Sequence, residues 1–333
     1  PETIIADHVQ KEVAISFTKT VSELKDVFSF RKVTKDSVQD MIRENRNQLE
    51  KFVTNSGMAQ ALEKLIDEIL NVPAVVLNLS TLDQIGGDFL KHVLNVSVIT
   101  LCLGRKFRLN YEEMKQLGMG VINYDLGLLA IPRELLEKEE ELTPEEKSVF
   151  EQHTVYGHLM LSQNPAFPPT SAAVALQHHE YQDGTGFPRK LRGDNRPPLK
   201  DFSRPSMIHR FAEIVAVADH YDMLTSGRRH FSTKLPLKEA MAELIRLAGG
   251  QLNSNVVKTL ISIVPVYPVG ARVRLIDSPV AQLIGYSGVV AKDNPEDLER
   301  PQVILYETRN HQRVKPVLIN LAQHSGFVLE LMG

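Results

Sequence analysis

Apolar residues recur at helical spacing through most of the chain and change to short alternating runs near its end. Residues 1–75 combine many charged residues with this spacing, as in SVQDMIRENRNQLEKF. Residues 76–265 predict successive helices, one of them with a start signal in Thr143, Pro144 and Glu146. The runs ARVRLI, PQVILYE and PVLINL, separated by Gly, Pro, Asp and Asn, predict a small β-rich tail at 266–333. We therefore predict a mostly α-helical protein with three regions.

Several apolar helix faces in the middle region contain a polar side chain that can bind a metal. The stripes are Phe89, His92, Val96 and Ile99; Met114, Leu117, Val121, Asp125 and Leu128; Val149, His153, Gly157 and Met160; and Ile208, Phe211, Val215, Asp219 and Asp222. A fifth apolar helix runs into His178 and His179. Each polar residue alone is more typical of a hydrogen-bonded core residue.

The set as a whole favours a metal centre, because ionised carboxylates that face a core are unfavourable unless they are paired or coordinated. Nitrogen and oxygen ligands without thiolate indicate iron, manganese or zinc in a catalytic role. Four histidines and two aspartates exceed the needs of one ion. We therefore predict a dinuclear centre of the kind that activates water and binds the oxygens of a phosphoryl group.

Composition narrows the class of protein further. The 333 residues have a net charge of −3, which gives no indication of a nucleic-acid polymer or a membrane surface as partner. No apolar run reaches the roughly 18 residues that cross a bilayer, and the first residues lack the pattern of a signal peptide. With Cys102 as the single cysteine, these features predict a cytoplasmic protein.

The segment HHEYQDGTGFP at 178–188 resembles the HHExxDGxGYP motif of the HD-GYP family, a group of HD-domain metal phosphohydrolases that hydrolyse cyclic di-GMP. Further segments match the family in the same order: HVLNV (92–96), YDLGLLAIP (124–132), QHTVYG (152–157), VADHYDMLTSGRR (217–229) and YPVGARVRL (267–275). The resemblance implies an HD-domain helical bundle at 76–265, with 266–333 as its C-terminal extension and 1–75 as a helical accessory region.

The resemblance also implies which residues form the site. The metal ligands would be His92, Asp125, His153, His178, His179 and Asp219, which hold two transition-metal ions, with iron preferred and manganese or zinc as alternatives. Asp125, Glu180 and Asp183 would be catalytic. Substrate would bind to Gly184, Gly186, Arg189, Lys190 and Arg228. Of these, Arg189 and Lys190 begin a basic stretch that also contains Arg192, Arg196, Lys200, Arg204 and Arg210.

Three departures from the family pattern leave two functions open. Tyr124, Leu128 and Phe187 stand where the family has histidine, lysine and tyrosine. The preferred interpretation is a cyclic di-GMP phosphodiesterase with reduced or altered activity, acting on this or a related cyclic dinucleotide. The alternative is a receptor or scaffold that binds the nucleotide and signals through a protein partner.

Two individual residues also have alternative interpretations. Tyr124 either ligates a metal as a phenolate or packs beside the metals and leaves a coordination position open, and we favour the second because its oxygen would overshoot an ion placed for an imidazole. Asp88 is better explained as a helix N-terminal carboxylate than as a contributor to a third metal position.

Overall fold

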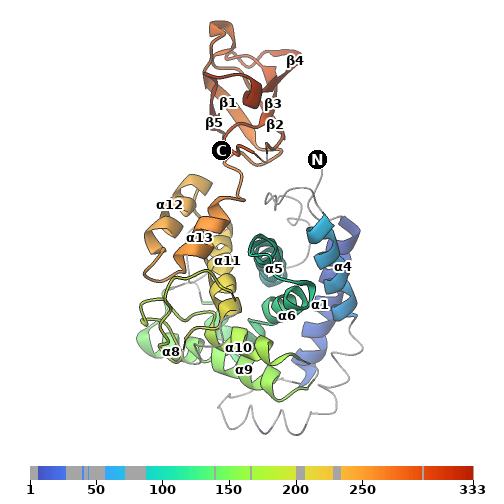
Figure 1. Cartoon of the computed structure of the whole chain (residues 1–333), viewed down its shortest axis with the longest axis vertical. Helices are drawn as coiled ribbons and strands as arrows, with labels where there is room; N and C mark the ends of the chain where they lie inside the picture. Colours follow the sequence, from blue (N-terminus) through green and yellow to red (C-terminus); the bar gives the residue numbers. More distant parts are fainter. Residues whose placement is uncertain are drawn as a thin grey trace. The chain divides into compact units, whose positions relative to one another are not determined.

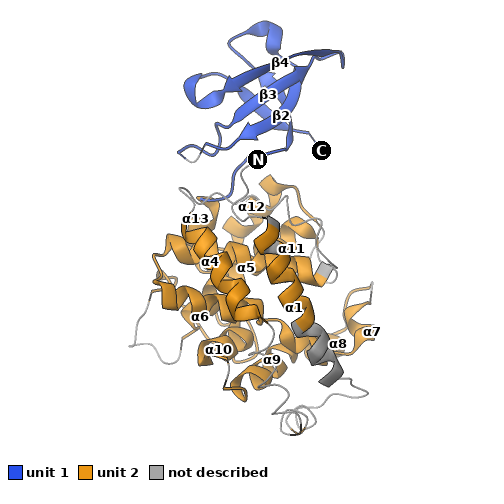
Figure 2. Cartoon of the chain, turned by 90° about the vertical axis from the view of Figure 1, so that its right-hand side faces the viewer, with its two compact units in different colours: residues 1–4, 72–81, 263–333 blue, residues 5–71, 82–262 orange. Residues whose placement is uncertain are grey.

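The computed structural model describes residues 7–27, 57–71, 88–138, 140–165, 167–199, 207–227, 234–294 and 296–332, together with residues 40 and 44. The chain divides into two compact units (Figure 2). Residues 5–71 and 82–262 form one unit, and residues 1–4, 72–81 and 263–333 form the other. The first is helical and the second is a β-sheet, so the predicted fold class is confirmed, while the division at residues 75 and 266 stays a prediction.

Helices make up the first unit (Figure 1). They are α1 (Asp7–Val27), α4 (Met58–Asn71), α5 (Asp88–Lys106), α6 (Tyr111–Ile122), the 3-10 helix η2 (Leu126–Ala130), α7 (Arg133–Leu136), α8 (Pro144–Glu151), α9 (His153–Ser162), α10 (Pro169–Gln177), α11 (Arg210–Ser226), α12 (Leu237–Leu247) and α13 (Ser254–Ile261). Helices α1 and α4 pack against each other, and α5 packs against α6 and α11. Helix α10 contacts α6, α9 and α11, so the helices that carry the predicted ligands are neighbours.

Side-chain caps fix where several of these helices begin. Thr143 caps α8 by accepting a hydrogen bond from the backbone N–H of Glu146, whose carboxylate accepts one from the N–H of Thr143. This capping box, with Pro144 in the first turn, confirms the predicted start. Asn110 and Glu113 form a second capping box at the start of α6.

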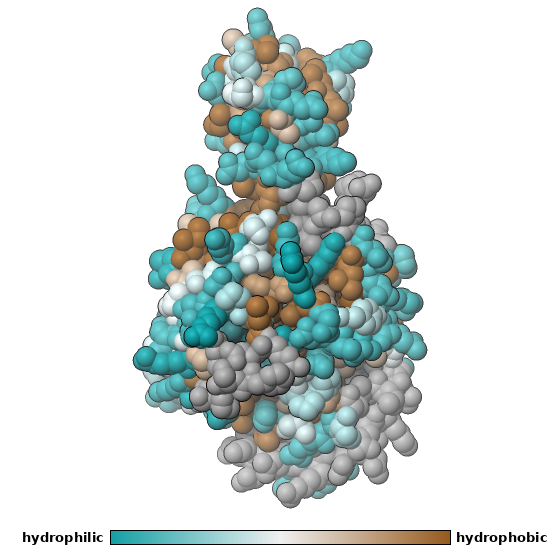
Figure 3. Space-filling model, viewed as in Figure 1, coloured by the Kyte–Doolittle hydropathy of each residue, from teal (hydrophilic) through white to brown (hydrophobic). Residues whose placement is uncertain are grey.

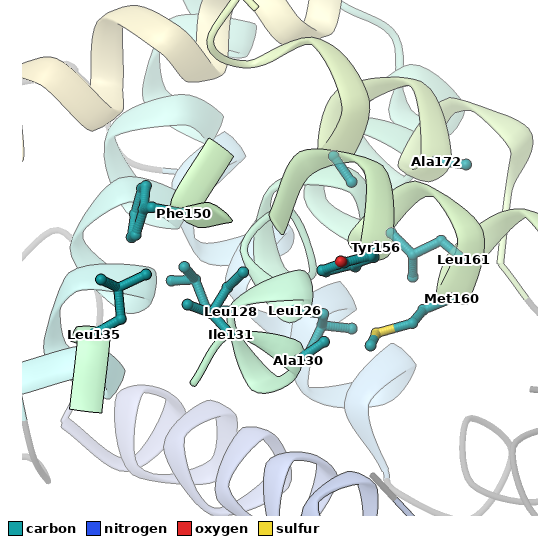
Figure 4. Packing of buried hydrophobic residues seen from close by; sticks show 11 residues of the cluster. Leu126, Leu128, Ala130, Ile131, Leu135, Phe150, Tyr156, Met160, Leu161 and Ala172 are labelled. Atoms are coloured by element: carbon teal, nitrogen blue, oxygen red, sulfur yellow. The ribbon is translucent and has the colours of Figure 1, made fainter. Parts of the chain in front are cut away.

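A buried apolar cluster holds η2 against the surrounding helices (Figure 4). Leu126 and Leu128 come from η2, Phe150 from α8, and Tyr156 and Met160 from α9. Burial of such side chains contributes on the order of 1.5–3 kcal/mol each before chain entropy is considered. The cluster therefore fixes the short segment that directly follows Asp125.

Gly127 allows this segment to approach α9 closely. A Cβ at Gly127 would collide with the backbone carbonyl of His153 and the backbone nitrogen of Gly157. Backbone atoms cannot move aside as a flexible side chain can, so any other residue would push η2 away from α9. Contact between these two backbones brings Asp125 next to His153.

The second unit is a five-stranded antiparallel sheet in the order β4-β3-β2-β1-β5. Its strands are β1 (Arg272–Asp277), β2 (Ser287–Lys292), β3 (Gln302–Glu307), β4 (Arg313–Asn320) and β5 (Val328–Leu331). Val273 and Leu275 of β1 point into the core of the sheet while Arg272 and Arg274 are exposed, which is the alternation of a half-buried strand. The three predicted runs are confirmed as β1, β3 and β4.

The face drawn in Figure 3 carries mostly charged and polar side chains, with apolar side chains in smaller groups between them. Within the described residues, no helix combines the length and the apolar character that crossing a bilayer requires.

We predict that the start of α11 is sensitive to acid. The Nδ1 atom of His209 accepts a hydrogen bond from the N–H of Phe211, which requires a neutral ring. Burial, reinforced by the charge of Arg210, lowers the pKa of His209 from 6.5 to about 4. The unfolded chain therefore takes up a proton before the folded chain does, and stability is lost as the pH falls from 6.5 to about 4.

The control is His209→Asn, because asparagine can cap a helix without titrating in this range. Denaturant unfolding should show a larger loss of stability between about pH 7 and about pH 4.5 for the natural protein than for the variant. Equal losses in the two proteins would contradict the assignment of His209 as the titrating cap.

Candidate metal centre

The six predicted metal ligands converge inside the helical unit. His92 and Asp219 lie within α5 and α11, as the stripes predict. All six side chains are buried, with His179 the most exposed at 8%. The structure therefore brings together residues that are up to 127 positions apart in the sequence.

Helix breaks precede two of the ligands, Asp125 and His153, which corrects their predicted stripes, whereas His178 and His179 lie at the end of an apolar helix as expected. Helix α6 ends at Ile122, so Asp125 lies in the turn before η2. His153 begins α9 after α8 has ended at Glu151, and His178 caps the C-terminus of α10, with His179 beyond it. Periodicity alone cannot detect these breaks, because the apolar spacing continues across them.

Asp125, His153 and His178 form one compact set. The Nε2 atoms of the two histidines are 3.3 Å apart, and the Oδ1 atom of Asp125 is 3.7 Å from His153 Nε2 and 3.6 Å from His178 Nε2. A point in the plane of these atoms lies about 2.0 Å from all three, which matches a metal–nitrogen or metal–oxygen bond. His179 completes the group, since a ring nitrogen of each of the three histidines lies within 4.8 Å of those of the others.

Backbone carbonyls fix the orientation of two imidazoles. His153 Nδ1 donates to the carbonyl of Phe150 at 2.7 Å, and His178 Nδ1 lies 3.0 Å from the carbonyl of Ala175. A carbonyl only accepts hydrogen bonds, so the proton of each neutral ring is on Nδ1 and the Nε2 lone pair faces the centre. A hydrogen bond from one ring nitrogen to a carbonyl is typical of histidines that bind a metal through the other nitrogen. This donor set therefore fits a transition-metal ion.

His179 is held in its neutral form. Burial lowers its pKa well below the usual 6.5, and the neighbouring His178 and His153 lower it further. The ring of Phe187 stacks on that of His179, with centroids 4.7 Å apart and an angle of 25° between the planes. The aromatic residue of the motif therefore packs against a candidate ligand.

His92 and Asp219 form a second set with Tyr124. The Tyr124 hydroxyl is 2.6 Å from His92 Nε2 and donates to Asp219 Oδ1 at 2.7 Å, while His92 Nε2 is 2.9 Å from Asp219 Oδ1. Burial opposes ionisation of Asp219, but the hydrogen bond and charge of His92 outweigh it, and the pKa of this carboxyl is below its usual value. Tyr124 thus points toward the centre and bonds two of the predicted ligands.

Asp222 supports His92 from the other side. Its Oδ2 atom accepts a hydrogen bond from His92 Nδ1 at 2.6 Å, and its Oδ1 atom accepts one from Asn95 Nδ2 at 2.7 Å. Asp222 lies on the predicted stripe of α11, although the sequence pattern predicted no role for it. Its spacing of three residues from Asp219, on the same helix face, is the signal that could have identified it.

Glu180 organises the loop that follows the histidines. Its buried carboxylate accepts hydrogen bonds from the backbone N–H groups of Arg189 at 2.7 Å and Leu191 at 2.8 Å. Lys190 between them has a left-handed backbone with φ of 56°, which turns both N–H groups toward the same carboxylate. Glu180 therefore has a structural role, and its catalytic role stays a prediction.

Gly184 and Gly186 are required in the loop for different reasons. Gly184 has a φ of 79°, a conformation that favours glycine. Gly186 packs so tightly that a Cβ there would collide with backbone atoms of His179 and Tyr181. Their predicted role in binding substrate is compatible with this geometry but not tested by it.

Asp183 forms its hydrogen bonds within the same loop. Its Oδ1 atom accepts from the backbone N–H of Thr185 at 2.8 Å and from the hydroxyl of Thr185 at 2.7 Å. These bonds lower the pKa of Asp183. A catalytic role for Asp183 stays a prediction.

The predicted basic stretch is less available to a ligand than its sequence indicates. Arg210 pairs with Glu113 at 2.8 Å, and Arg196 pairs with Asp194 at 3.2 Å. Arg189 and Lys190 are exposed. Arg228, Lys200, Arg204 and the side chain of Asp88 lie outside the described residues.

Tyr181 occupies a variable position of the motif, so the sequence gives no indication of a role for it. Burial raises the pKa of its phenol, and the charge of Asp219 raises it further. The phenol therefore lies within electrostatic range of a candidate ligand.

Leu128 is also part of the local packing. It is buried with Ile131, Leu135 and Phe150 in the cluster of Figure 4. A lysine at this position would place an ammonium group among apolar side chains, which is unfavourable without a partner.

The sequence profile of the HD-domain family matches residues 63–256, which is more than half of the chain. The chain belongs to the HD-domain family. Curated relatives include a cyclic di-GMP phosphodiesterase of Pseudomonas aeruginosa, 26% identical over 87% of this chain and 64% of its own length, and one of Thermotoga maritima, 36% identical over 42% of this chain and 35% of its own length. The predicted relationship to HD-domain proteins that act on cyclic di-GMP is confirmed by these matches.

Another relative is the 3'3'-cGAMP-specific phosphodiesterase 2 of Vibrio cholerae, 24% identical over 67% of this chain and 41% of its own length. The chain spans less than two thirds of the length of these curated relatives. A solved structure of an HDGYP protein from Bdellovibrio bacteriovorus aligns at 21% identity and a TM-score of 0.49, covering 72% of this chain and 76% of that one.

We predict that Glu180→Gln weakens the fold even when no substrate is present. The amide nitrogen of glutamine would face a backbone N–H, so one of the two hydrogen bonds to Arg189 and Leu191 is lost. The loss of a buried acceptor should lower the free energy of unfolding by about 1–3 kcal/mol. Denaturant unfolding measures this loss.

Glu137→Gln is the matched control, because Glu137 is exposed and pairs with Arg133 on the surface. An equally small change in both variants would show that the carboxylate of Glu180 does not stabilise the loop.

Proposed function

We propose that this protein is a metal-dependent phosphodiesterase that hydrolyses cyclic di-GMP or a related cyclic dinucleotide. The observation that carries the proposal is the convergence of Asp125 Oδ1 with the Nε2 atoms of His153 and His178, beside His179, in a chain of the HD-domain family. Relatives of this chain are named as phosphodiesterases of cyclic di-GMP and of 3'3'-cGAMP, which supports this class of substrate.

A transition-metal ion, for which we prefer iron over manganese or zinc, would supply Lewis acidity toward a phosphoryl oxygen and toward water at this position. The chain's own residues have two further tasks. The carbonyls of Phe150 and Ala175 hold His153 and His178 with their lone pairs inward. The hydroxyl of Tyr124 donates its proton to Asp219, and the Nδ1 atom of His92 donates to Asp222, so both side chains are kept oriented beside the centre.

The surroundings of the centre suit an anionic nucleotide. The positive charges of Arg189 and Lys190 are exposed on the loop and raise the local concentration of an anion. Phe187 lacks the hydroxyl of the family's tyrosine and cannot form its hydrogen bond. Phe187 instead contributes to the site by packing its ring against His179.

The six ligands predicted from the sequence would hold two metal ions. A second ion would need His92 and Asp219, and both would have to give up their present hydrogen bonds to Tyr124. The number of ions is therefore a separate question from the presence of a metal. A cytoplasmic location and a signalling partner protein stay predictions.

The second candidate function is a receptor that binds the nucleotide without hydrolysing it. Leu128 favours this alternative, because it replaces a charged residue of the family pattern with a side chain that is part of the apolar cluster. The two functions differ in one measurable respect, namely the appearance of a linear dinucleotide or mononucleotide product.

We predict that protein loaded anaerobically with iron or manganese slowly converts cyclic di-GMP to a linear product. The substitution His178→Ala should lower the metal content of the protein and reduce its turnover by about 100-fold or more. The control is His158→Ala, since His158 Nδ1 bonds to the carbonyl of Ala172 outside the centre. Product analysis by chromatography and metal analysis of the same samples provide the two measurements.

Nucleotide binding by metal-loaded protein with no product from cyclic di-GMP or 3'3'-cGAMP would favour the receptor. Equal effects of the two histidine substitutions on metal content would argue against the proposed centre itself.

A further inference from the structure

We propose that this centre binds a single metal ion, held by Asp125, His153, His178 and His179, and that the Tyr124 hydroxyl fills the place of a second ion between His92 and Asp219. The proposal rests on the proposed function only for the presence of a metal. A single ion, instead of the two predicted from the sequence, follows from a difference between the two sets of side chains. Acceptor atoms face one another in the first set, whereas hydrogen bonds join the side chains of the second.

In the first set, lone pairs face lone pairs. With the protons of His153 and His178 on their Nδ1 atoms, neither Nε2 can donate to the other across the 3.3 Å that separates them. The Oδ1 atom of Asp125 adds a third acceptor at 3.6 to 3.7 Å. These separations exceed good hydrogen-bond lengths and equal those between ligands of a common ion.

In the second set, two contacts pair a donor with an acceptor. Asp222 accepts from His92 Nδ1, and Asp219 accepts from the Tyr124 hydroxyl. The oxygen of Tyr124 also lies 2.6 Å from His92 Nε2. The Tyr124 oxygen thus lies at ordinary hydrogen-bond lengths from both His92 Nε2 and Asp219 Oδ1, and so occupies the space between the two side chains that a second ion would need.

The spacing of the second set also disfavours an ion. The mutual distances among Tyr124 oxygen, His92 Nε2 and Asp219 Oδ1 are 2.6, 2.7 and 2.9 Å. The point in their plane equidistant from all three lies about 1.6 Å from each, whereas bonds from zinc to nitrogen or oxygen are about 2.0–2.2 Å long. Ligand atoms around a tetrahedral ion with bonds of this length are about 3.4 Å apart, so a tetrahedral ion here would have to spread the three side chains.

Packing restrains such a spread. Tyr124 is fully buried, and its ring meets the ring of His178 edge-on with centroids 4.8 Å apart. Displacing the Tyr124 ring would therefore press on a ligand of the first set. Asp222 is bonded to both His92 and Asn95, which keeps the imidazole of His92 in place.

Metal analysis of the anaerobically loaded protein tests the proposal without any measurement of turnover. We expect about one ion per chain in the natural protein and in Tyr124→Phe, and about two in Tyr124→His, which replaces the hydroxyl with a nitrogen ligand. Two ions in the natural protein, or an unchanged single ion in folded Tyr124→His, would overturn it.

His92→Gln gives a second readout if Tyr124→His does not fold. A single-ion centre predicts that His92→Gln keeps the ion content of the natural protein, whereas a dinuclear centre predicts the loss of one ion. Manganese loading adds a spectroscopic check, because an isolated Mn²⁺ ion and a coupled pair differ in their electron paramagnetic resonance spectra. A coupled spectrum in the natural protein would overturn the proposal.

Direct ligation by Tyr124 is tested by absorption. Oxidised, iron-loaded protein should lack the visible charge-transfer band of a ferric phenolate, since Tyr124 donates its proton to Asp219. A band that disappears in Tyr124→Phe would make Tyr124 a ligand and contradict the proposed arrangement. One ion without turnover would count against the proposed function alone, and two ions with turnover would count against this proposal alone.

Discussion

The carbonyl groups at the ends of two helices determine the geometry of the centre. The last carbonyls of an α-helix have no partner within the helix and need a donor from elsewhere. Phe150 in the last turn of α8 and Ala175 in the last turn of α10 receive theirs from the Nδ1 atoms of His153 and His178. Each imidazole thereby satisfies a helix terminus and turns its other nitrogen toward Asp125. The helix breaks that interrupt the sequence pattern are thus the feature that makes a cation site.

The rest of the helical unit maintains this arrangement. Gly127 lets η2 lie against the backbone of α9, and the apolar cluster around Leu126 and Phe150 keeps it there. On the other side, Glu180 holds the loop after the histidines through two backbone N–H groups, so that Phe187 reaches the ring of His179. The positions of the ligands therefore depend on contacts made by residues that are not ligands.

The sequence predicts the components of this structure better than their arrangement. The capping box at Thr143, the β-strands and the inward direction of His92 and Asp219 follow from local rules, because caps and periodicity depend on neighbouring residues. The helix ends before Asp125 and His153 were not predicted, because they result from contacts between distant segments. The loop role of Glu180 was missed for the same reason, since its two partners lie nine and eleven residues later.

His92 joins two helices through both of its ring nitrogens. Its Nε2 atom meets Asp219 and its Nδ1 atom meets Asp222, and these carboxylates are three residues apart on one face of α11. A shift of α11 along α5 by a single residue, about 1.5 Å, would misalign both bonds at once. The imidazole of His92 therefore fixes the register between the two helices. Any movement of one helix along the other would displace Asp219 and, through its hydrogen bond, the hydroxyl of Tyr124.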